Sequence, residues 1–365
     1  MILTGIITGA IISFIGFKIV PTIIEYNQRT KFKRSNKLKD KVEREKAPLP
    51  MKKLESIKDI DLLNIICAIE SKFNEKDLNN FHYNIKNLKI RTKDNLDKIM
   101  NASVKNSVEG GYSPFNNKIV LKKDRRGNKV LSHEMIHLAS SAKKRKFSLP
   151  FTGFAQISLL KPEIGLGLTE GYTEYLNNEL FTSDNRKIDS AYLFEQVSAK
   201  AIEDIVGKDD MRSLYLNADL KGLYNKLSEY YTEKEIDTLI IGLDNINKYT
   251  NYDGSNTSVN KMLSKSFGKV VMLISKGLIK KLEINNYNPG ILYKYFRNMN
   301  NMKEVLTCCG EEKNKEMIDF IDDQVSNTYL FFKQYGINIS LEDAKSYKDY
   351  VLTRKNWLLN DNYIR

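Results

Sequence analysis

Cysteine and histidine are scarce in this sequence, with three of each among 365 residues. Cys67 stands alone, and Cys308 and Cys309 are adjacent, so the spacing fits neither a disulfide framework nor a cysteine-based zinc site. An internal repeat, a glycine-rich phosphate loop and an acidic calcium loop are also lacking, which argues against repeat proteins, P-loop enzymes and EF-hand proteins. The thiols are therefore expected to be reduced, as in a cytoplasmic protein.

Two of the three histidines, His133 and His137, lie four residues apart in a His-Glu-Met-Ile-His segment. The surrounding run Val130–Ala142 favours a helix, on which these side chains project from one face about 5.4 Å apart and reach a single Zn²⁺. Glu134, beside that face, can accept a proton from a water molecule at the metal. The alternative is a core helix, which would bury two imidazoles and a carboxylate without a metal to offset their desolvation.

A second segment, Gly165–Leu176, carries Glu170 and Glu174 four residues apart on a predicted helix over Thr169–Leu180. The two carboxylates therefore share one helix face. One of them can complete a His₂Glu ligand set, and the other can accept the N–H of a ligating histidine and fix its tautomer.

The two segments together resemble the gluzincin metallopeptidases, the group that includes thermolysin, in which His-Glu-x-x-His is followed by Glu-x-x-x-Asp or Glu-x-x-x-Glu on a second helix. The resemblance implies that His133, His137 and Glu170 bind one Zn²⁺, that Glu134 is the general base, and that Glu174 accepts a hydrogen bond from the N–H of a ligating histidine.

The resemblance extends from Ser107 to Leu180 and includes two departures. Glu174 stands where an aspartate is common, which preserves the carboxylate. No histidine follows His137, so the histidine that helps to stabilise the oxyanion in thermolysin-like enzymes has no counterpart. A tyrosine, arginine or lysine must take that role, and the sequence does not identify it.

The segment Val108–Leu121 directly precedes the predicted metal helix. In zincins the strand at this position is the sheet edge along which an extended substrate lies. Gly110 and Gly111, followed by Tyr112, would permit close backbone approach and form this substrate edge. An ordinary hairpin is the other interpretation, and the two are compatible.

The N-terminal run has no charged side chain up to Phe17 and continues past Lys18 to Ile24. A helix of this length reaches about 36 Å, enough to cross a bilayer. Residues 1–25 are therefore predicted to be a single transmembrane anchor rather than a cleaved signal peptide, because a basic n-region and a small-residue cleavage site are not evident. Gly5, Gly9 and Ser13 form a small-residue stripe that suggests a homodimer contact in the membrane.

Residues 26–53 carry 11 Lys and Arg against 3 Asp and Glu, a net charge of +8 out of +13 for the chain. By the positive-inside rule the chain after the anchor faces the cytoplasm of a bacterial cell, and this basic flank can also lie on anionic headgroups. Nucleic-acid binding is the other explanation of the positive net charge. It is not favoured, because only +5 remains outside this segment.

We expect a basic juxtamembrane linker over residues 26–50, a zincin-like core over 51–185, and a helical C-terminal part over 186–365. In the core we predict a helix over Ser56–Phe73 and a small sheet. His82 is interpreted as a structural residue without a nearby acidic partner. The predicted strands are Tyr83–Ile90, Ser103–Val108 and Lys118–Leu121. The predicted C-terminal helices are Ala191–Val206, Asp209–Tyr230, Glu233–Tyr249, Val259–Leu282, Gly290–Leu306, Asn314–Tyr335 and Leu341–Asn356.

The combined interpretation is an α+β, membrane-anchored zinc metallopeptidase acting on a peptide or protein. Two other classes stay open. One is a zinc-stabilised scaffold that binds peptides without cutting them, although Glu134 would then have no role. The other is a membrane-surface interaction protein without a metal.

Overall fold

The structure is a computed structural model, and it describes most of the chain between residues 38 and 348. The described ranges are 38–46, 48–55, 59–93, 109–122, 128–143, 149–156, 164–181, 192–249, 257–333 and 339–348. The predicted anchor, its small-residue stripe and the predicted strand over residues 103–108 lie outside these ranges.

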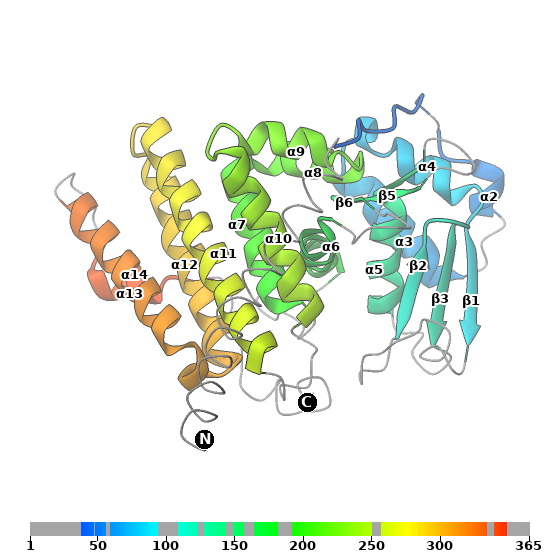
Figure 1. Cartoon of the computed structure of the whole chain (residues 1–365). Coiled ribbons are helices and arrows are strands. Elements are labelled where there is room, and N and C mark those ends of the chain that lie inside the picture. The colour runs from blue at the N-terminus through cyan, green and yellow to red at the C-terminus, as the bar shows by residue number, and fades with distance from the viewer. Residues whose placement is uncertain are drawn as a thin grey trace, which may run out of the picture.

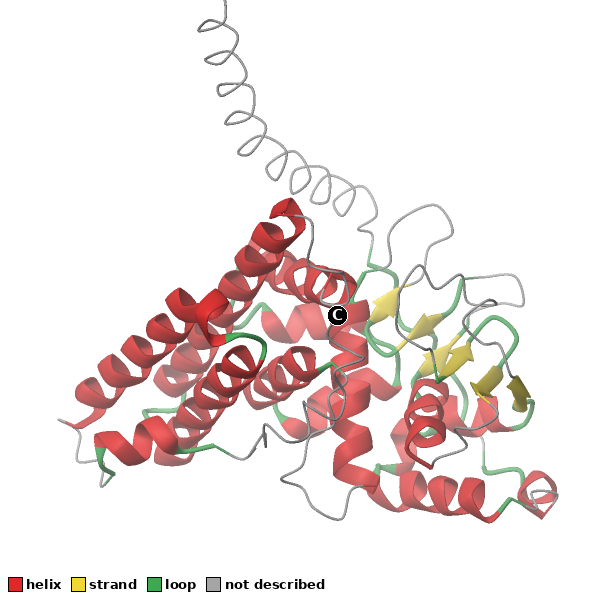
Figure 2. Ribbon diagram, turned by 90° about the horizontal axis from the view of Figure 1, so that it is seen from below, coloured by secondary structure: helices red, strands yellow, loops and turns green. Residues whose placement is uncertain are grey.

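The chain is mostly helical, with two small sheets, so the broad α+β prediction holds. Figures 1 and 2 show the strands gathered at one end of the molecule and the later helices stacked side by side at the other. The helices on the sheet side and at the centre are α2 Met51–Glu55, α3 Ile60–Lys72, α4 Asn79–Ile85, α5 Asn128–Ala139 and α6 Leu166–Phe181. The remaining helices are α7 Leu193–Val206, α8 Lys208–Leu216, α9 Leu220–Leu227, α10 Glu233–Tyr249, α11 Thr257–Ile284, α12 Pro289–Cys308, α13 Glu311–Lys333 and α14 Leu341–Ser346.

The larger sheet has the strand order β1-β3-β2 and packs against α5. Its strands are β1 Lys89–Lys93, β2 Gly110–Ser113 and β3 Lys118–Lys122, with β1 parallel and β2 antiparallel to β3. Ile119 and Leu121 of β3 are buried against the core. The smaller sheet follows α5 and consists of the two-residue strands β4 Ser141–Ala142, β5 Phe151–Thr152 and β6 Ala155–Gln156.

The prediction of a strand over Tyr83–Ile90 is wrong in its first half, because α4 occupies Asn79–Ile85 and β1 begins only at Lys89. Phe81 and Ile85 are four residues apart and both are fully buried, so helical spacing places them on one apolar face. The sequence reading also missed the partner of His82. Its Nε2 atom contacts the carboxylate of Glu70 on α3.

The helix predicted over Asp209–Tyr230 is two helices, α8 and α9. The chain turns at Ala218, which has a positive φ of 53°, and the side chain of Asp219 accepts from the N–H of Gly222 to cap α9. The last predicted helix also ends early, at Ser346, because Tyr347 is extended. The helix predicted from Ser56 begins at Ile60, where Asp59 caps it.

Among the described residues, no helix is long and apolar enough to cross a bilayer. Part of the segment predicted as a linker contacts the folded core. Arg44 donates to the side-chain oxygen of Asn80 at 2.8 Å and lies over the ring of Tyr83, 3.8 Å from its centroid.

Candidate metal centre

Helix α5 carries His133, Glu134 and His137 on the side that faces α6, while Met135 and Ile136 are buried in the core. The helix was expected to continue to Ala142 but ends at Ala139. The hydroxyls of the next two serines, Ser140 and Ser141, both donate to the carbonyl oxygen of His137, at 3.2 and 2.8 Å. These bonds satisfy a carbonyl of the last helical turn and allow β4 to begin.

Helix α6 begins at Leu166, earlier than predicted, because a distant carboxylate caps it. The N–H groups of Gly165 and Gly167 each donate to Asp244 of α10, both at 2.9 Å. A Cβ atom at Gly167 would lie only 2.2 Å from the carbonyl oxygen of Leu243. The close approach of α6 to α10 therefore requires glycine at this position. Glu170 is the fifth residue of α6.

Three side-chain atoms from the two helices converge on one point. The Nε2 atoms of His133 and His137 are 3.1 Å apart, and the Oε2 atom of Glu170 lies 3.5 Å from the first and 3.4 Å from the second. Both histidines are buried and Glu170 is partly buried. This group can hold a metal ion.

The other ring nitrogen of each histidine is oriented by α6. The Nδ1–H of His133 donates to Glu174 Oε2 at 2.7 Å. The Nδ1 atom of His137 is 3.4 Å from the hydroxyl of Thr173, whose own proton goes to the carbonyl oxygen of Thr169 at 2.7 Å. With Nδ1 carrying the proton in both rings, each Nε2 presents its lone pair to the convergence point.

Glu134 lies between the convergence point and strand β2. Its carboxylate accepts a hydrogen bond from the main chain of Tyr112, and its Oε1 atom is 3.5 Å from the position a Cβ would take at Gly110. The predicted substrate-edge residues and the predicted base are therefore neighbours. Burial raises the pKa of Glu134, although the two histidines oppose that shift.

Strand β2 is an edge of its sheet, since its neighbour β3 lies between it and β1. The carbonyl oxygen of Glu109 accepts from the N–H of Lys122 at 2.8 Å. Because the pattern alternates in an antiparallel pair, the main-chain groups of Gly110 and Tyr112 point away from β3 towards this edge.

Tyr192 is a site residue that the sequence did not identify. It precedes α7 with φ 54° and ψ 35°, a left-handed conformation that is uncommon for tyrosine. Its ring stacks on His133 with centroids 6.2 Å apart and an interplanar angle of 19°. The charge of Glu170 and burial raise the pKa of Tyr192 well above its ordinary value, so its hydroxyl stays protonated and can donate.

The carboxylates of Glu170 and Glu174 also affect the protonation of His133. Burial opposes protonation of His133, but hydrogen bonds to Glu170 and Glu174 raise its pKa well above the ordinary value. Burial likewise opposes ionisation of Glu170, and the nearby histidines lower its pKa. A cation is therefore favoured at this position, whether it is a proton on His133 or a metal ion between the three groups.

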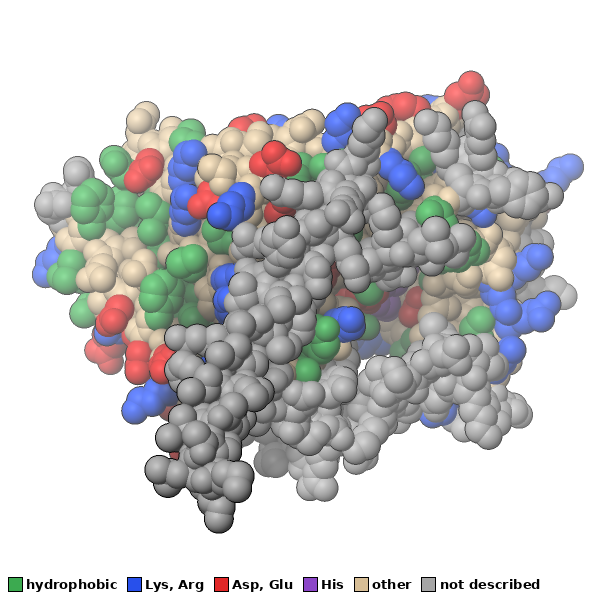
Figure 3. Space-filling view, in the orientation of Figure 1, with side chains coloured by type: hydrophobic (Ala, Val, Ile, Leu, Met, Phe, Trp, Pro, Cys, Tyr) green, Lys and Arg blue, Asp and Glu red, His purple; other side chains and the backbone are tan. Residues whose placement is uncertain are grey.

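Figure 3 shows histidine atoms, with acidic atoms beside them, in a hollow near the middle of the visible face. The hollow lies between the sheet side and the helical side of the molecule in the orientation of Figure 1.

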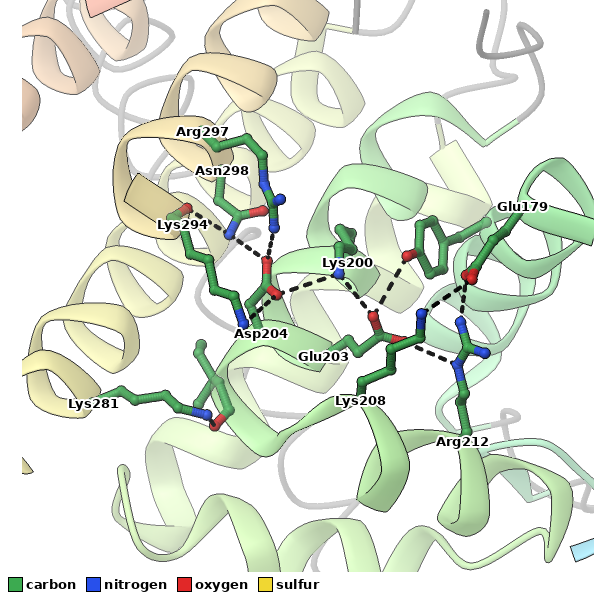
Figure 4. Close-up of polar contacts among 12 residues, drawn as sticks. Glu179, Lys200, Glu203, Asp204, Lys208, Arg212, Lys281, Lys294, Arg297 and Asn298 are labelled. Carbon is green, nitrogen blue, oxygen red and sulfur yellow. Dashed lines mark hydrogen bonds and ion pairs between the residues drawn. The ribbon is translucent and has the colours of Figure 1, made fainter. Parts of the chain in front are cut away.

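A second group of buried charges, the ionic cluster, lies towards the other end of α7 (Figure 4). It consists of Glu203 and Asp204 with the cations Lys200, Arg212, Lys294 and Arg297. Lys200 Nζ is 2.8 Å from Glu203 and 3.3 Å from Asp204, and Arg297 Nη2 is 2.5 Å from Asp204. Burial raises the pKa of Asp204, but these cations outweigh it and lower the pKa below its ordinary value.

Two tyrosines connect α6 to the helical part. The hydroxyl of Tyr172 donates to Glu203 at 2.6 Å, and the hydroxyl of Tyr215 on α8 donates to Thr173 at 2.5 Å. Thr173 and Tyr215, like Tyr192, were missed by the sequence reading. Thr173 lies three residues after Glu170, on the same helix face, and this spacing could have identified it.

All the predicted site residues are brought together: the two histidines and Glu134 on α5, Glu170 and Glu174 on α6, and the Gly110–Tyr112 edge on β2. Comparison of the chain with protein-family models, with curated proteins and with solved structures finds no match.

Proposed function

We propose that this protein is a zinc-dependent metallopeptidase similar to the gluzincins. The observation that carries the proposal is the spacing of 3.1, 3.4 and 3.5 Å between the His133, His137 and Glu170 ligand atoms. Two ligands at about 2.0–2.1 Å from a tetrahedral zinc ion are about 3.3–3.4 Å apart. The three groups thus fit one zinc ion with a fourth position open.

The donor set also suits zinc chemically. Two neutral imidazoles and one carboxylate form a ligand set typical of catalytic zinc, in which a water or substrate atom takes the remaining position. Glu174 and Thr173, behind the histidines, supply the outer contacts that such ligands need. When bound, zinc would act as a Lewis acid and lower the pKa of water.

The surrounding residues would then carry out peptide hydrolysis. An extended peptide can pair with the outward main-chain groups of Gly110 and with the carbonyl oxygen of Tyr112, whose N–H donates to Glu134, and so bring its own carbonyl beside Glu134. Glu134 would accept the proton of the attacking water and pass it to the leaving amine. Burial raises the pKa of Glu134, which makes its carboxylate a stronger base than an ordinary one.

We propose Tyr192 as the hydrogen-bond donor that takes the place of the oxyanion-stabilising histidine of thermolysin-like enzymes. Its protonated hydroxyl belongs to a ring stacked on a zinc ligand. We propose that this hydroxyl donates a hydrogen bond to the carbonyl oxygen as negative charge develops on it during attack. One fixed donor of this kind contributes about 10²–10³-fold in rate. The membrane anchor and the cytoplasmic orientation remain predictions from the sequence.

The test is a comparison of Glu134→Gln with the unchanged full-length chain, purified in detergent and loaded with zinc. The variant should keep about one zinc ion per chain while peptide-library cleavage falls by about 10²–10⁴-fold, since an amide cannot accept the proton. The matched control is Glu283→Gln, at an exposed position on α11, which should leave cleavage unchanged.

Two outcomes would count against the peptidase. If the unchanged chain holds stoichiometric zinc and cuts no peptide in a diverse library, the zinc-stabilised scaffold is the better explanation. If the chain binds no zinc, a surface interaction protein without a metal replaces both.

A further inference from the structure

The outer face of the larger sheet carries five cations. In the parallel pair, Lys89 of β1 is in register with Lys118 of β3, and Lys93 is in register with Lys122. Paired residues share a face of the sheet and successive residues alternate, so Arg91 lies on the same face. These five residues are called the cationic sheet face: Lys89, Arg91, Lys93, Lys118 and Lys122.

The alternate residues identify this face as the one turned away from the core. Ile119 and Leu121 point to the other side, where they are fully or almost fully buried and where β3 and β2 contact α5. On the cationic side, Lys89 and Arg91 are exposed, and the other three cations are partly exposed. Figure 3 shows Lys and Arg side chains gathered at the right-hand margin, beside the strands of Figure 1.

The charges on this face are not balanced as those of the ionic cluster are. Among the described residues, none of the five cations forms an ion pair. Within the described strands and their flanking residue, Glu109, opposite Lys122, is the one acidic residue that the register brings to this side, so these described positions carry a net charge of +4. Like charges directly opposite each other destabilise a sheet, so an anionic partner would stabilise this arrangement.

We propose that the cationic sheet face lies on the anionic headgroups of a lipid bilayer. The face consists of short strands whose outward positions between the cations are Val120, Gly111 and Ser113. These described strand positions carry no aromatic side chain on which nucleotide bases could stack, as single-stranded nucleic acid binders have. Four to eight clustered cations close to a membrane-associated segment are typical of binding to anionic lipid.

The position of the cationic sheet face in the sequence also favours a lipid bilayer as its partner. The N-terminal apolar run is predicted to anchor the chain, and the basic flank that follows it ends only 36 residues before Lys89. The sheet would add a second, folded contact with the same membrane surface. This inference does not depend on the proposed peptidase activity.

The experiment uses the full-length chain in lipid nanodiscs, either of phosphatidylcholine alone or with about one-third phosphatidylglycerol. Lysine acetylation is followed by mass spectrometry at low and high salt. Lys89, Lys93, Lys118 and Lys122 should be several-fold less reactive in the anionic nanodiscs, and high salt should remove the protection. Lys234 and Lys261, exposed on α10 and α11, should react equally in both lipids.

A pair of variants tests whether the charge itself is responsible. All four lysines are changed to Gln in one variant and to Arg in the other, and Arg91 is the reporter through its reaction with phenylglyoxal. Each cation at an anionic surface contributes about fivefold to partitioning. Protection of Arg91 should therefore persist in the Arg variant and disappear in the Gln variant.

Three results would overturn the proposal. The first is equal reactivity in neutral and anionic nanodiscs, and the second is protection that survives in the Gln variant. The third is stronger protection by duplex DNA than by anionic nanodiscs at the same salt concentration, which would assign the face to nucleic acid instead.

Discussion

The candidate metal centre and the ionic cluster both bury carboxylates, but they balance the charge in different ways. In the ionic cluster, Glu203 and Asp204 are surrounded by the four cations named above. The candidate metal centre holds Glu134, Glu170 and Glu174, and the Nζ atom of Lys129 lies 3.8 Å from Glu174 Oε1. The ionic cluster is neutralised by its own side chains, whereas the three converging groups of the other region can hold a metal ion or a proton.

The largest effect should come from removing a ligand. His133→Ala should weaken zinc binding by well over 100-fold, because the three-ligand site loses geometry as well as a donor. Glu174→Ala, which removes only the partner of His133, should cost about 10–100-fold. Zinc affinity is measured by competition with a chromophoric chelator. If Glu174→Ala abolishes binding while Glu170→Ala does not, the roles of the two carboxylates are reversed.

The next largest effect should come from removing one carboxylate of the ionic cluster. Glu203→Ala removes the acceptor of Tyr172 and leaves Lys200 near a single carboxylate, so the free energy of unfolding should fall by about 3–5 kcal/mol. Chemical denaturation of the full-length chain measures the loss, with Glu283→Ala as the exposed control. The loss should be the same with and without a chelator, and a strong dependence on zinc would show that the two regions are not separate.

The smallest effect concerns Glu195, a buried acid near the start of α7 whose pKa is raised to about 7, chiefly by burial. The folded chain keeps this proton at pH values where the unfolded chain has lost it, so stability falls as the pH rises from about 4.5 to 7. Glu195→Gln stays neutral and should be about 1–3 kcal/mol more stable than the unchanged chain at pH 8. The difference should fade below pH 5. An equal difference at pH 5 and pH 8 would contradict the assignment.

The site residues that the sequence predicted occur in pairs at short sequence spacing. His133 with His137, and Glu170 with Glu174, are pairs four residues apart, and a helix converts that spacing into a shared face. Residues that reach the centre from elsewhere have no such signature. Tyr192 arrives through a left-handed turn, and Tyr215 arrives from α8 through packing of α6 against the helical part.

The errors in the fold have the same origin. A strand was predicted over Tyr83–Ile90, but burial of Phe81 and Ile85 on one face favours the helix α4. The break at Ala218 depends on its backbone conformation and on the Asp219 cap rather than on a proline or glycine at the turn. The contact between His82 and Glu70 joins side chains 12 residues apart on two helices.

The cap of α6 has a consequence for the order of assembly during synthesis. Asp244 lies 77 residues after Gly167, whose N–H it accepts, so the start of α6 lacks this partner until α10 has left the ribosome. The helix bearing Glu170 is therefore completed late, after both histidines and Glu134 have long been available. A nascent or truncated chain lacking α10 would carry the His-Glu-x-x-His segment without a fully fixed Glu170. The candidate metal centre is therefore completed only when most of the polypeptide has been made.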